Sequence, residues 1–314
     1  MPDDPRLLPM AADVPAGGPP VFERMAVVGL GLIGGSIALA ARQAWPSALV
    51  IGVDRNEVLE KAMVRHAIDV ASSDLMIVSE ADLVILAAPV RENLALLEAV
   101  AERIAGEAVI TDVGSAKRGI VAAGTALPPR VVFVGGHPLA GMARGGFDLA
   151  RADLFARRPW LLTPPGEGRG EAWDSAARRV AAFVEGLGGK LETLESAEAH
   201  DRLVAFLSHL PQLTASALAG VVGEAVGEEL RLAGRGLADT TRLASSPADI
   251  WRDICAANAD EIAPALDRLI AALQGVRDGL GSDRAIEDLF DTANRWRETL
   301  EESINKSSDQ EIRK

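Results

Sequence analysis

The chain has a single cysteine, fewer basic than acidic residues, and no apolar run long enough to cross a bilayer. Cys255 cannot form an internal disulfide, and no Cys/His cluster has zinc-ligand spacing, so we predict neither disulfide nor metal. Lys and Arg total 32 against 45 Asp and Glu, and the formal net charge of −13 opposes binding to nucleic acid or anionic membranes. The longest apolar stretches, such as 83–90, fall short of the ~20 residues of a transmembrane helix.

The length of 314 residues and the 48% hydrophobic content predict a chain of two domains with a sizeable core. Residues 1–20 contain acidic residues and several prolines but no long apolar core, so we expect a flexible leader and not a signal peptide. We predict a cytoplasmic protein.

A glycine-rich motif follows the strand-like run 25–29 and opens an apolar helical stretch. Gly29 permits a tight turn, Gly31 lets the backbone approach a pyrophosphate, and Gly34 lets the helix pack closely on the strand. The pattern predicts a dinucleotide-binding domain, the alternative being a glycine-rich turn in an unrelated α/β protein. The predicted cofactor contacts in this motif are Gly29, Leu30, Gly31, Leu32, Ile33 and Gly34.

Asp54 ends a second strand-like run twenty residues after Gly34. A carboxylate there can accept hydrogen bonds from the adenosine ribose and repels a 2′-phosphate, which favours NAD over NADP. Arg55 leaves NADP open, because its guanidinium could bind a 2′-phosphate; it could equally be a solvated surface arginine.

Strand-like and helical patterns alternate up to residue 194, which predicts an α/β fold with a doubly wound, mostly parallel Rossmann-type sheet. From residue 195 the periodicity is helical, which predicts an all-helical second domain. We expect domains at 21–194 and 195–306 and a polar tail at 307–314. The expected strands are 25–29, 49–54, 82–87, 108–112, 131–135, 159–163 and 190–194, and the expected C-terminal helices are 198–222, 224–237, 247–258, 261–280 and 285–305.

Ligands of such sheets bind beyond the carboxyl ends of the strands, so residues that follow strands are candidates for the site. Ala88, Pro89, Asp112 and Ser115 follow two predicted strands, and we assign them to the cofactor. Pro89 could instead be a simple turn residue, and Ser115 could be the N-cap of the next helix.

His137 follows the strand at 131–135, at the same edge of the sheet. An imidazole there can hold a hydroxyl proton near neutral pH while a hydride leaves the same carbon, so we predict a catalytic role. The alternative is a loop histidine with a structural hydrogen bond.

Two further candidates lie in the helical part. His209 precedes Pro211, whose missing N–H should bend the helix and expose polar groups near His209. His200 lies nine residues earlier and should face the opposite side of a straight helix, outside the same site. Arg242 lies in a polar break and could bind a carboxylate through two N–H donors, or form an interhelix salt bridge.

Five motifs together resemble the prephenate/arogenate dehydrogenase family of tyrosine biosynthesis. They are Gly29–Ser36, Asp112–Lys117, His137–Gly141, Ser208–Pro211 and Asp239–Arg242. The resemblance implies a nucleotide-binding domain followed by a helical domain that forms a homodimer, and an NAD-dependent oxidative decarboxylation that aromatises a cyclohexadienyl ring.

The resemblance also implies roles for individual residues. His137 would accept the ring hydroxyl proton or hydrogen bond, Ser115 would help to orient it, and Arg242 would bind the ring carboxylate. His209 would contact the substrate from the helical side, and Trp251 would form a wall of the pocket.

The chain departs from the family pattern after His137-Pro-Leu-Ala-Gly141, where many members have a small hydroxyl residue, an acid and a lysine-like residue. Here the sequence is Met142-Ala143-Arg144. Gly141 and Met142 remain predicted substrate contacts, and Arg144 could favour the pyruvyl keto acid of prephenate. We expect no separate mutase or amino-acid-sensing domain.

Three alternatives stay open from sequence. The enzyme could use arogenate or both cyclohexadienyl compounds. A 3-hydroxy acid dehydrogenase is disfavoured because stretch 195–305 contains no lysine to act as acid and base. A nucleotide-sensing binding protein would have no reason to keep both His137 and Arg242.

Overall fold

The computed structural model describes residues 18–142, 144–166 and 170–309. Most of the predicted leader, Ala143 and the last five residues of the predicted polar tail lie outside the described residues.

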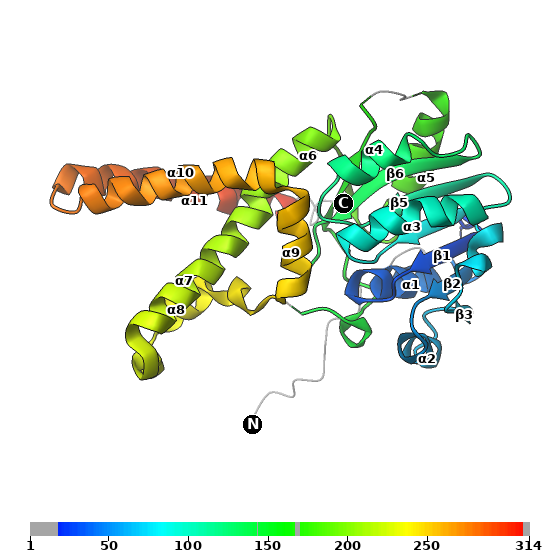
Figure 1. Ribbon diagram of the computed structural model, residues 1–314, viewed down its shortest axis with the longest axis horizontal. Helices are drawn as coiled ribbons and strands as arrows, with labels where there is room; N and C mark the ends of the chain where they lie inside the picture. Colours follow the sequence, from blue (N-terminus) through cyan, green and yellow to red (C-terminus); the bar gives the residue numbers. More distant parts are fainter. Residues whose placement is uncertain (1–17, 143, 167–169, 310–314) are drawn as a thin grey trace. The chain divides into compact units, whose positions relative to one another are not determined.

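The first part of the chain forms an eight-stranded sheet in the order β3-β2-β1-β4-β5-β6-β7-β8 (Figure 1). All neighbouring strands are parallel except β6 and β7, which are antiparallel. The strand order reverses between β1 and β4, so a crevice for a ligand opens at their carboxyl ends. The prediction of a doubly wound, mostly parallel Rossmann-type sheet is confirmed. The strands are β1 (Arg24–Val28), β2 (Leu49–Val53), β3 (Val70–Ser72), β4 (Leu83–Leu86), β5 (Ala108–Asp112), β6 (Val131–Pro138), β7 (Pro159–Thr163) and β8 (Lys190–Thr193).

Helices cover the sheet and form all regular structure described after β8. The α-helices are α1 (Leu32–Ala44), α2 (Asn56–Val64), α3 (Val90–Arg103), α4 (Arg118–Gly124), α5 (Glu171–Gly186), α6 (Ala197–Val204), α7 (Leu210–Val226), α8 (Arg235–Thr240), α9 (Ala248–Ala257), α10 (Ala259–Asp278) and α11 (Asp283–Asp309). The 3-10 helices are η1 (Leu75–Glu80), η2 (Phe147–Leu149), η4 (Gly227–Leu232) and η5 (Arg242–Ser245), and η3 (Ala205–His209) is a π-helix.

Three local features differ from the sequence-based prediction. Strand β3 was missed, because three residues are too few to show a period. Strand β6 continues to Pro138 because its last residues pair with β7, so His137 lies within the strand and not after it. The predicted helix 224–237 is wrong: Gly227, with φ of 50°, ends α7, and a 3-10 helix follows.

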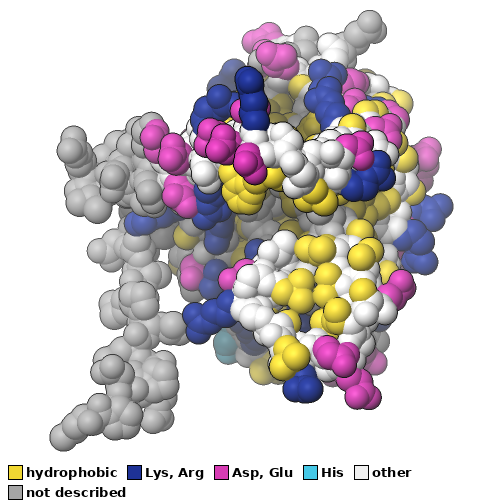
Figure 2. Space-filling view, turned by 90° about the vertical axis from the view of Figure 1, so that its left-hand side faces the viewer, with side chains coloured by type: hydrophobic (Ala, Val, Ile, Leu, Met, Phe, Trp, Pro, Cys, Tyr) yellow, Lys and Arg dark blue, Asp and Glu magenta, His cyan; other side chains and the backbone are white. Residues whose placement is uncertain are grey.

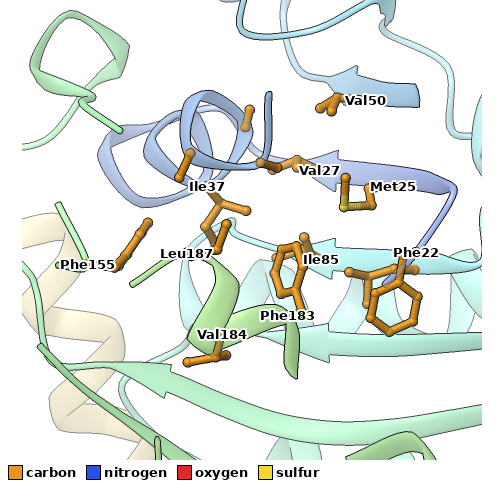
Figure 3. Packing of buried hydrophobic residues seen from close by; sticks show 14 of the residues in the cluster. Phe22, Met25, Val27, Ile37, Val50, Ile85, Phe155, Phe183, Val184 and Leu187 are labelled. Atoms are coloured by element: carbon orange, nitrogen blue, oxygen red, sulfur yellow. The ribbon is translucent and has the colours of Figure 1, made fainter. Parts of the chain in front are cut away.

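The larger core cluster lies between the sheet and helices α1 and α5 (Figure 3). Phe183 of α5 stacks on Trp45, with ring centroids 5.5 Å apart, and meets Phe22 edge-on at 6.1 Å. These buried rings fix α5 on the sheet and thereby support the strands that carry the site.

The chain divides into two compact units, one up to Ile262 and one from Ala263 onward. In the second unit, Ser282 accepts a hydrogen bond from the Ala285 N–H and caps α11, which runs back along α10 (Figure 1). All site residues discussed below belong to the first unit. The domain boundary at 194/195 stays a prediction.

One helical stretch of the described chain, Ala197–Leu232, is by length and composition long and apolar enough to cross a membrane. The stretch is interrupted by η3 and carries the buried polar residues His200, Asp201 and His209. Length and composition of a single helix are weak evidence for a membrane span, and these polar groups are bound within the protein.

Candidate functional site

The glycine turn joins β1 to α1 at the crevice and requires glycine at two positions. Gly29 has a φ of +95°, and a Cβ there would lie 2.8 Å from the Ala87 carbonyl. A Cβ on Gly34 would lie 1.9 Å from the Gly29 oxygen. Any side chain at either position would therefore push α1 away from the strands.

Gly31 is the N-cap of α1, and a Cβ added there would meet no protein atom within 4 Å. The space before the helix N-terminus is open, and the first N–H groups of a helix have no intrahelical acceptor. Leu30, Leu32 and Ile33 complete the turn. This cradle fits the diphosphate of a dinucleotide.

Asp54 follows β2 and lies beside the glycine turn. One carboxylate oxygen accepts a hydrogen bond from the Leu30 N–H at 2.6 Å, and the other accepts from the Arg55 N–H at 2.7 Å. The carboxylate therefore supports the turn, and a contact between Asp54 and a ribose stays a prediction. The Arg55 side chain is 85% exposed, as expected of a surface arginine.

The turn after β4 contains Ala88 and Pro89 and is held by Asn93, which sequence analysis did not single out. The Ala88 N–H donates to Asn93 Oδ1 at 3.0 Å, and Asn93 Nδ2 donates to the Leu86 carbonyl at 3.2 Å. A buried amide on α3 thus shapes the loop at the crevice.

Asp112 forms a buried ion pair with Lys117, and the two side chains are 1% and 0% exposed. The Asp112 carboxylate also accepts hydrogen bonds from the N–H groups of Gly114 at 2.8 Å and Gly136 at 3.2 Å. The pair ties the loop after β5 to β6. Sequence analysis assigned Asp112 to the cofactor; the structure gives its carboxylate this supporting role, and a cofactor contact stays a prediction.

A cavity of about 470 Å³ opens beside this loop. It brings together residues that are far apart in the sequence, from α1, the loop after β5, β6, α6, α7, η5 and α9. Among the predicted site residues it is lined by Ile33, Ser115, His137, Gly141, Met142, Arg242 and Trp251. Arg144 and His209 are not among its lining residues.

His137 projects from the end of β6 and is 7% exposed. Its Nδ1 lies 2.9 Å from Nε2 of His200. Burial, together with the charges of His200, Lys117 and His209, holds the pKa of His137 well below its usual value. The imidazole is therefore neutral at neutral pH and can accept a proton or a hydrogen bond.

Ser115 lies half-buried in the wall of the cavity that His137 also lines. Its alternative assignment as a helix N-cap is wrong: α4 begins at Arg118, its N-cap is Lys117, and the cap makes no side-chain hydrogen bond. The Ser115 hydroxyl is thus free of a capping role.

His200 and His209 belong to one polar cluster, so the prediction that they lie in separate places is wrong. The helix is not straight, because residues 205–209 form a π-helix in which the Leu210 N–H donates to the Ala205 carbonyl. The wider turn changes the angular offset between the two histidines. Pro211 follows immediately, in the first turn of α7.

His209 is fully buried behind Trp251, and the two rings meet edge to face at 5.9 Å. Asn258 Nδ2 lies 3.2 Å from His209 Nδ1, and Nε2 has no hydrogen-bond partner among the described residues. A direct contact between His209 and a substrate stays a prediction.

Arg242 begins η5 and lines the cavity, and no ion pair joins it to any described residue. The salt-bridge alternative therefore finds no support in the described chain. Gln212, missed by sequence analysis, fixes η5 against α7: its Nε2 donates to the Leu243 carbonyl at 2.7 Å, and its Oε1 accepts from Ser246 at 3.1 Å.

A second cluster behind the cavity centres on Arg118, which sequence analysis also missed. Its guanidinium pairs with Asp201 at 3.1 Å and with Asp260, and it donates to Asn258 at 3.0 Å. The hydrogen bond from Arg118 lowers the pKa of Asp260 to about 2. No local pattern marks these residues, because their partners are about 60 to 140 positions apart in sequence.

Comparison with known proteins agrees with this architecture. The family model "Prephenate dehydrogenase, nucleotide-binding domain" matches residues 37–193, and "Prephenate dehydrogenase, dimerization domain" matches residues 196–295. The chain belongs to the prephenate dehydrogenase family. The first match begins just after the glycine turn, whose assignment rests on its geometry.

Relatives cover most of the chain. It is 36% identical to a prephenate dehydrogenase of Bacillus subtilis over 87% of this chain and 75% of the relative. It is 34% identical to a cyclohexadienyl dehydrogenase of Zymomonas mobilis over 83% of this chain and 90% of the relative. The crystal structure of A. aeolicus prephenate dehydrogenase in complex with hydroxyphenyl propionate and NAD+ superposes with a TM-score of 0.80 at 27% identity, over 88% of this chain and 98% of that one.

The buried state of His209 predicts a dependence of stability on pH. Burial lowers the pKa of His209 from 6.5 to about 4. As pH falls, the unfolded chain therefore protonates His209 before the folded protein does. The free energy of unfolding keeps its full value above pH 6.5 and falls by about 3 kcal/mol toward pH 4.

We expect His209→Asn, which keeps an acceptor near Nδ1 but cannot be protonated, to flatten the pH dependence of the free energy of unfolding in this window. Urea titrations at a series of pH values measure it. His66→Asn, at an exposed residue with φ of 53°, serves as control. Equal slopes for His209→Asn and the unmodified protein would contradict the prediction.

Proposed function

We propose that the protein catalyses the NAD-dependent oxidative decarboxylation of prephenate to 4-hydroxyphenylpyruvate in tyrosine biosynthesis. The observation that carries the proposal is the placement of a neutral imidazole, His137, and a guanidinium, Arg242, on the walls of one cavity beside the nucleotide crevice. Among the described residues, Arg242 has no ion-pair partner. Family membership favours this over a 3-hydroxy acid dehydrogenase or a nucleotide sensor.

NAD is the cofactor that the crevice fits. The open cradle at Gly31 suits a diphosphate, and Asp54 places a carboxylate where it would accept ribose hydrogen bonds and repel a 2′-phosphate. Ala88, Pro89 and Ser115 would lie along the nicotinamide half. When bound, NAD accepts the hydride that leaves the carbinol carbon of the ring.

The residues that line the cavity have the remaining roles in the proposed reaction. His137 accepts the proton of the ring hydroxyl as the carbonyl forms, and loss of carbon dioxide then aromatises the ring. Ser115 helps to orient the imidazole and the hydroxyl. Arg242 binds the ring carboxylate through two N–H donors, Trp251 walls the pocket, and Gly141 and Met142 contact the substrate side chain.

The choice between prephenate and arogenate depends on the side chain of the substrate. The Zymomonas mobilis relative is named a cyclohexadienyl dehydrogenase, which keeps dual use as the alternative. We favour prephenate because Arg144, exposed and two residues after the lining residue Met142, would add positive charge near the pyruvyl end.

A homodimer formed through the helical domain accounts for exposed apolar side chains on its helices. Figure 2 shows hydrophobic side chains gathered on one face among acidic and basic ones. A matched dimerization-domain family model supports the same arrangement. We propose a cytoplasmic enzyme with these faces covered by a second copy. The large exposed residues include Leu207, Val221, Leu232, Leu273, Phe290 and Trp296.

A spectrophotometric assay of NADH formation, run with prephenate and arogenate side by side, tests the proposed activity. We expect NAD-dependent turnover with prephenate at a higher kcat/KM than with arogenate, because the pyruvyl group carries no ammonium to be repelled by Arg144. A higher kcat/KM with arogenate would contradict the role of Arg144, and no turnover with either compound would overturn the function.

For His137→Asn we expect kcat to fall roughly 10²-fold or more with KM little changed, since the general base is lost while the cavity is kept. Steady-state kinetics with prephenate and NAD measure both constants. Unchanged turnover would remove His137 from the mechanism.

For Arg242→Ala we expect a rise in KM that corresponds to about 2–5 kcal/mol, because a carboxylate would then be desolvated without its partner. Arg252→Ala on α9, at an exposed residue outside the cavity lining, is the matched control and should leave KM within about twofold. A normal KM in Arg242→Ala would exclude this guanidinium from substrate binding.

A further inference from the structure

A buried hydrogen-bonded chain leads away from His137 on the side opposite the cavity. His137 Nδ1 lies 2.9 Å from His200 Nε2, and His200 Nδ1 lies 2.8 Å from Asp201 Oδ1. His200 and Asp201 are fully buried. Neither residue lines the cavity, so neither can touch a substrate there.

Asp201 is surrounded by donors. Its Oδ1 also accepts from the Lys117 N–H at 2.7 Å, and its Oδ2 accepts from the Arg118 N–H and Nε, both at 3.1 Å. Burial opposes ionisation, but the hydrogen bonds from His200, Arg118 and Lys117 outweigh it and hold the pKa of this carboxyl below its usual value. Asp201 is therefore a carboxylate and can only accept.

The direction of every hydrogen bond in the chain follows from that charge. Because Asp201 accepts, His200 Nδ1 must carry a hydrogen. Burial lowers the pKa of His200, and the Asp201 hydrogen bond only partly opposes it, so His200 is neutral and its Nε2 is an acceptor. His137 Nδ1 must then donate to His200, which leaves His137 Nε2 without a proton.

His137 Nε2 makes no hydrogen bond to any described residue, and the ring lines the cavity. The nitrogen that carries a lone pair is therefore the one available to a ligand. If the chain ran the other way, with His200 donating to His137, Nε2 would carry a proton and could not act as a base.

We propose that His200 and Asp201 are positioning residues that hold His137 in its Nδ1–H tautomer, so that Nε2 faces the substrate as a proton acceptor. The inference rests on the proposed function and deepens it. In the reaction, the ring hydroxyl proton moves to His137 Nε2, and the C–H and carboxylate C–C bonds break as described above. The resulting imidazolium still donates from Nδ1 to His200, and the Asp201 carboxylate offsets its charge.

Two substitutions of His200 separate this role from simple packing. In His200→Gln, the side-chain amide can donate to Asp201 while its carbonyl accepts from His137, which reproduces the pattern of the imidazole. In His200→Leu, the volume is largely kept but both hydrogen bonds are lost. His66→Asn controls for loss of a histidine elsewhere.

We expect His200→Leu to lower kcat roughly 10²-fold or more with KM for prephenate within about twofold, and His200→Gln to recover at least about tenfold of that loss. Equal losses in both variants, or wild-type kcat in His200→Leu, would overturn the positioning role.

A spectroscopic readout needs neither substrate nor turnover. In ¹⁵N-histidine NMR spectra of the wild-type protein at neutral pH, we expect His137 to show a protonated Nδ1 and an unprotonated Nε2, with mixed tautomers in His200→Leu. A wild-type His137 protonated at Nε2 would overturn the inference even if His200→Leu failed to fold. Lack of turnover with prephenate and arogenate would overturn the proposed function but not the inference about the tautomer, because the NMR spectrum reports the tautomer independently.

Discussion

The arrangement of the site depends on the buried ion pair between Lys117 and Asp112. Both charges lie out of water, and breaking such a pair by removing one partner costs about 3–5 kcal/mol. The hydrogen bonds from Gly114 and Gly136 to Asp112 hold the loop after β5 against β6. Ser115, in this loop, and His137, at the end of β6, are therefore held at one edge of the sheet.

The same loop also holds the first helix after the sheet. The Lys117 N–H donates to Asp201 of α6, and Arg118 reaches Asp201, Asn258 and Asp260. The buried cation of Lys117 and the half-buried cation of Arg118 are offset by the carboxylates of Asp112, Asp201 and Asp260. The polar chain behind His137 is thus part of the structural support as well as of the proposed mechanism.

Much of the site could be predicted from short patterns. The glycine turn, Asp54 and Ser115 follow strands, and His137 lies at the end of one, so the fold rules bring them to one edge of the sheet. Arg242 lies in a polar break between helices. Lys117 was seen only as part of a motif, and His200 was placed elsewhere. Their roles depend on burial and, for His200, on the π-helix at 205–209. Neither feature can be deduced from a regular spacing of 3.6 residues per turn.

The sequence by itself determined the class of the fold, the nucleotide turn and the chemical kind of the reactive groups, because glycine spacing and hydrophobic periodicity are local properties. Only the tertiary structure decided that His137 pairs with His200, where the charges of Lys117 and Asp112 are neutralised, and that Arg242 finds no acidic partner in the described chain. Those outcomes depend on distances between residues far apart in sequence. Burial strengthens the electrostatic interaction at each of those distances, because the protein interior screens charges less than water does.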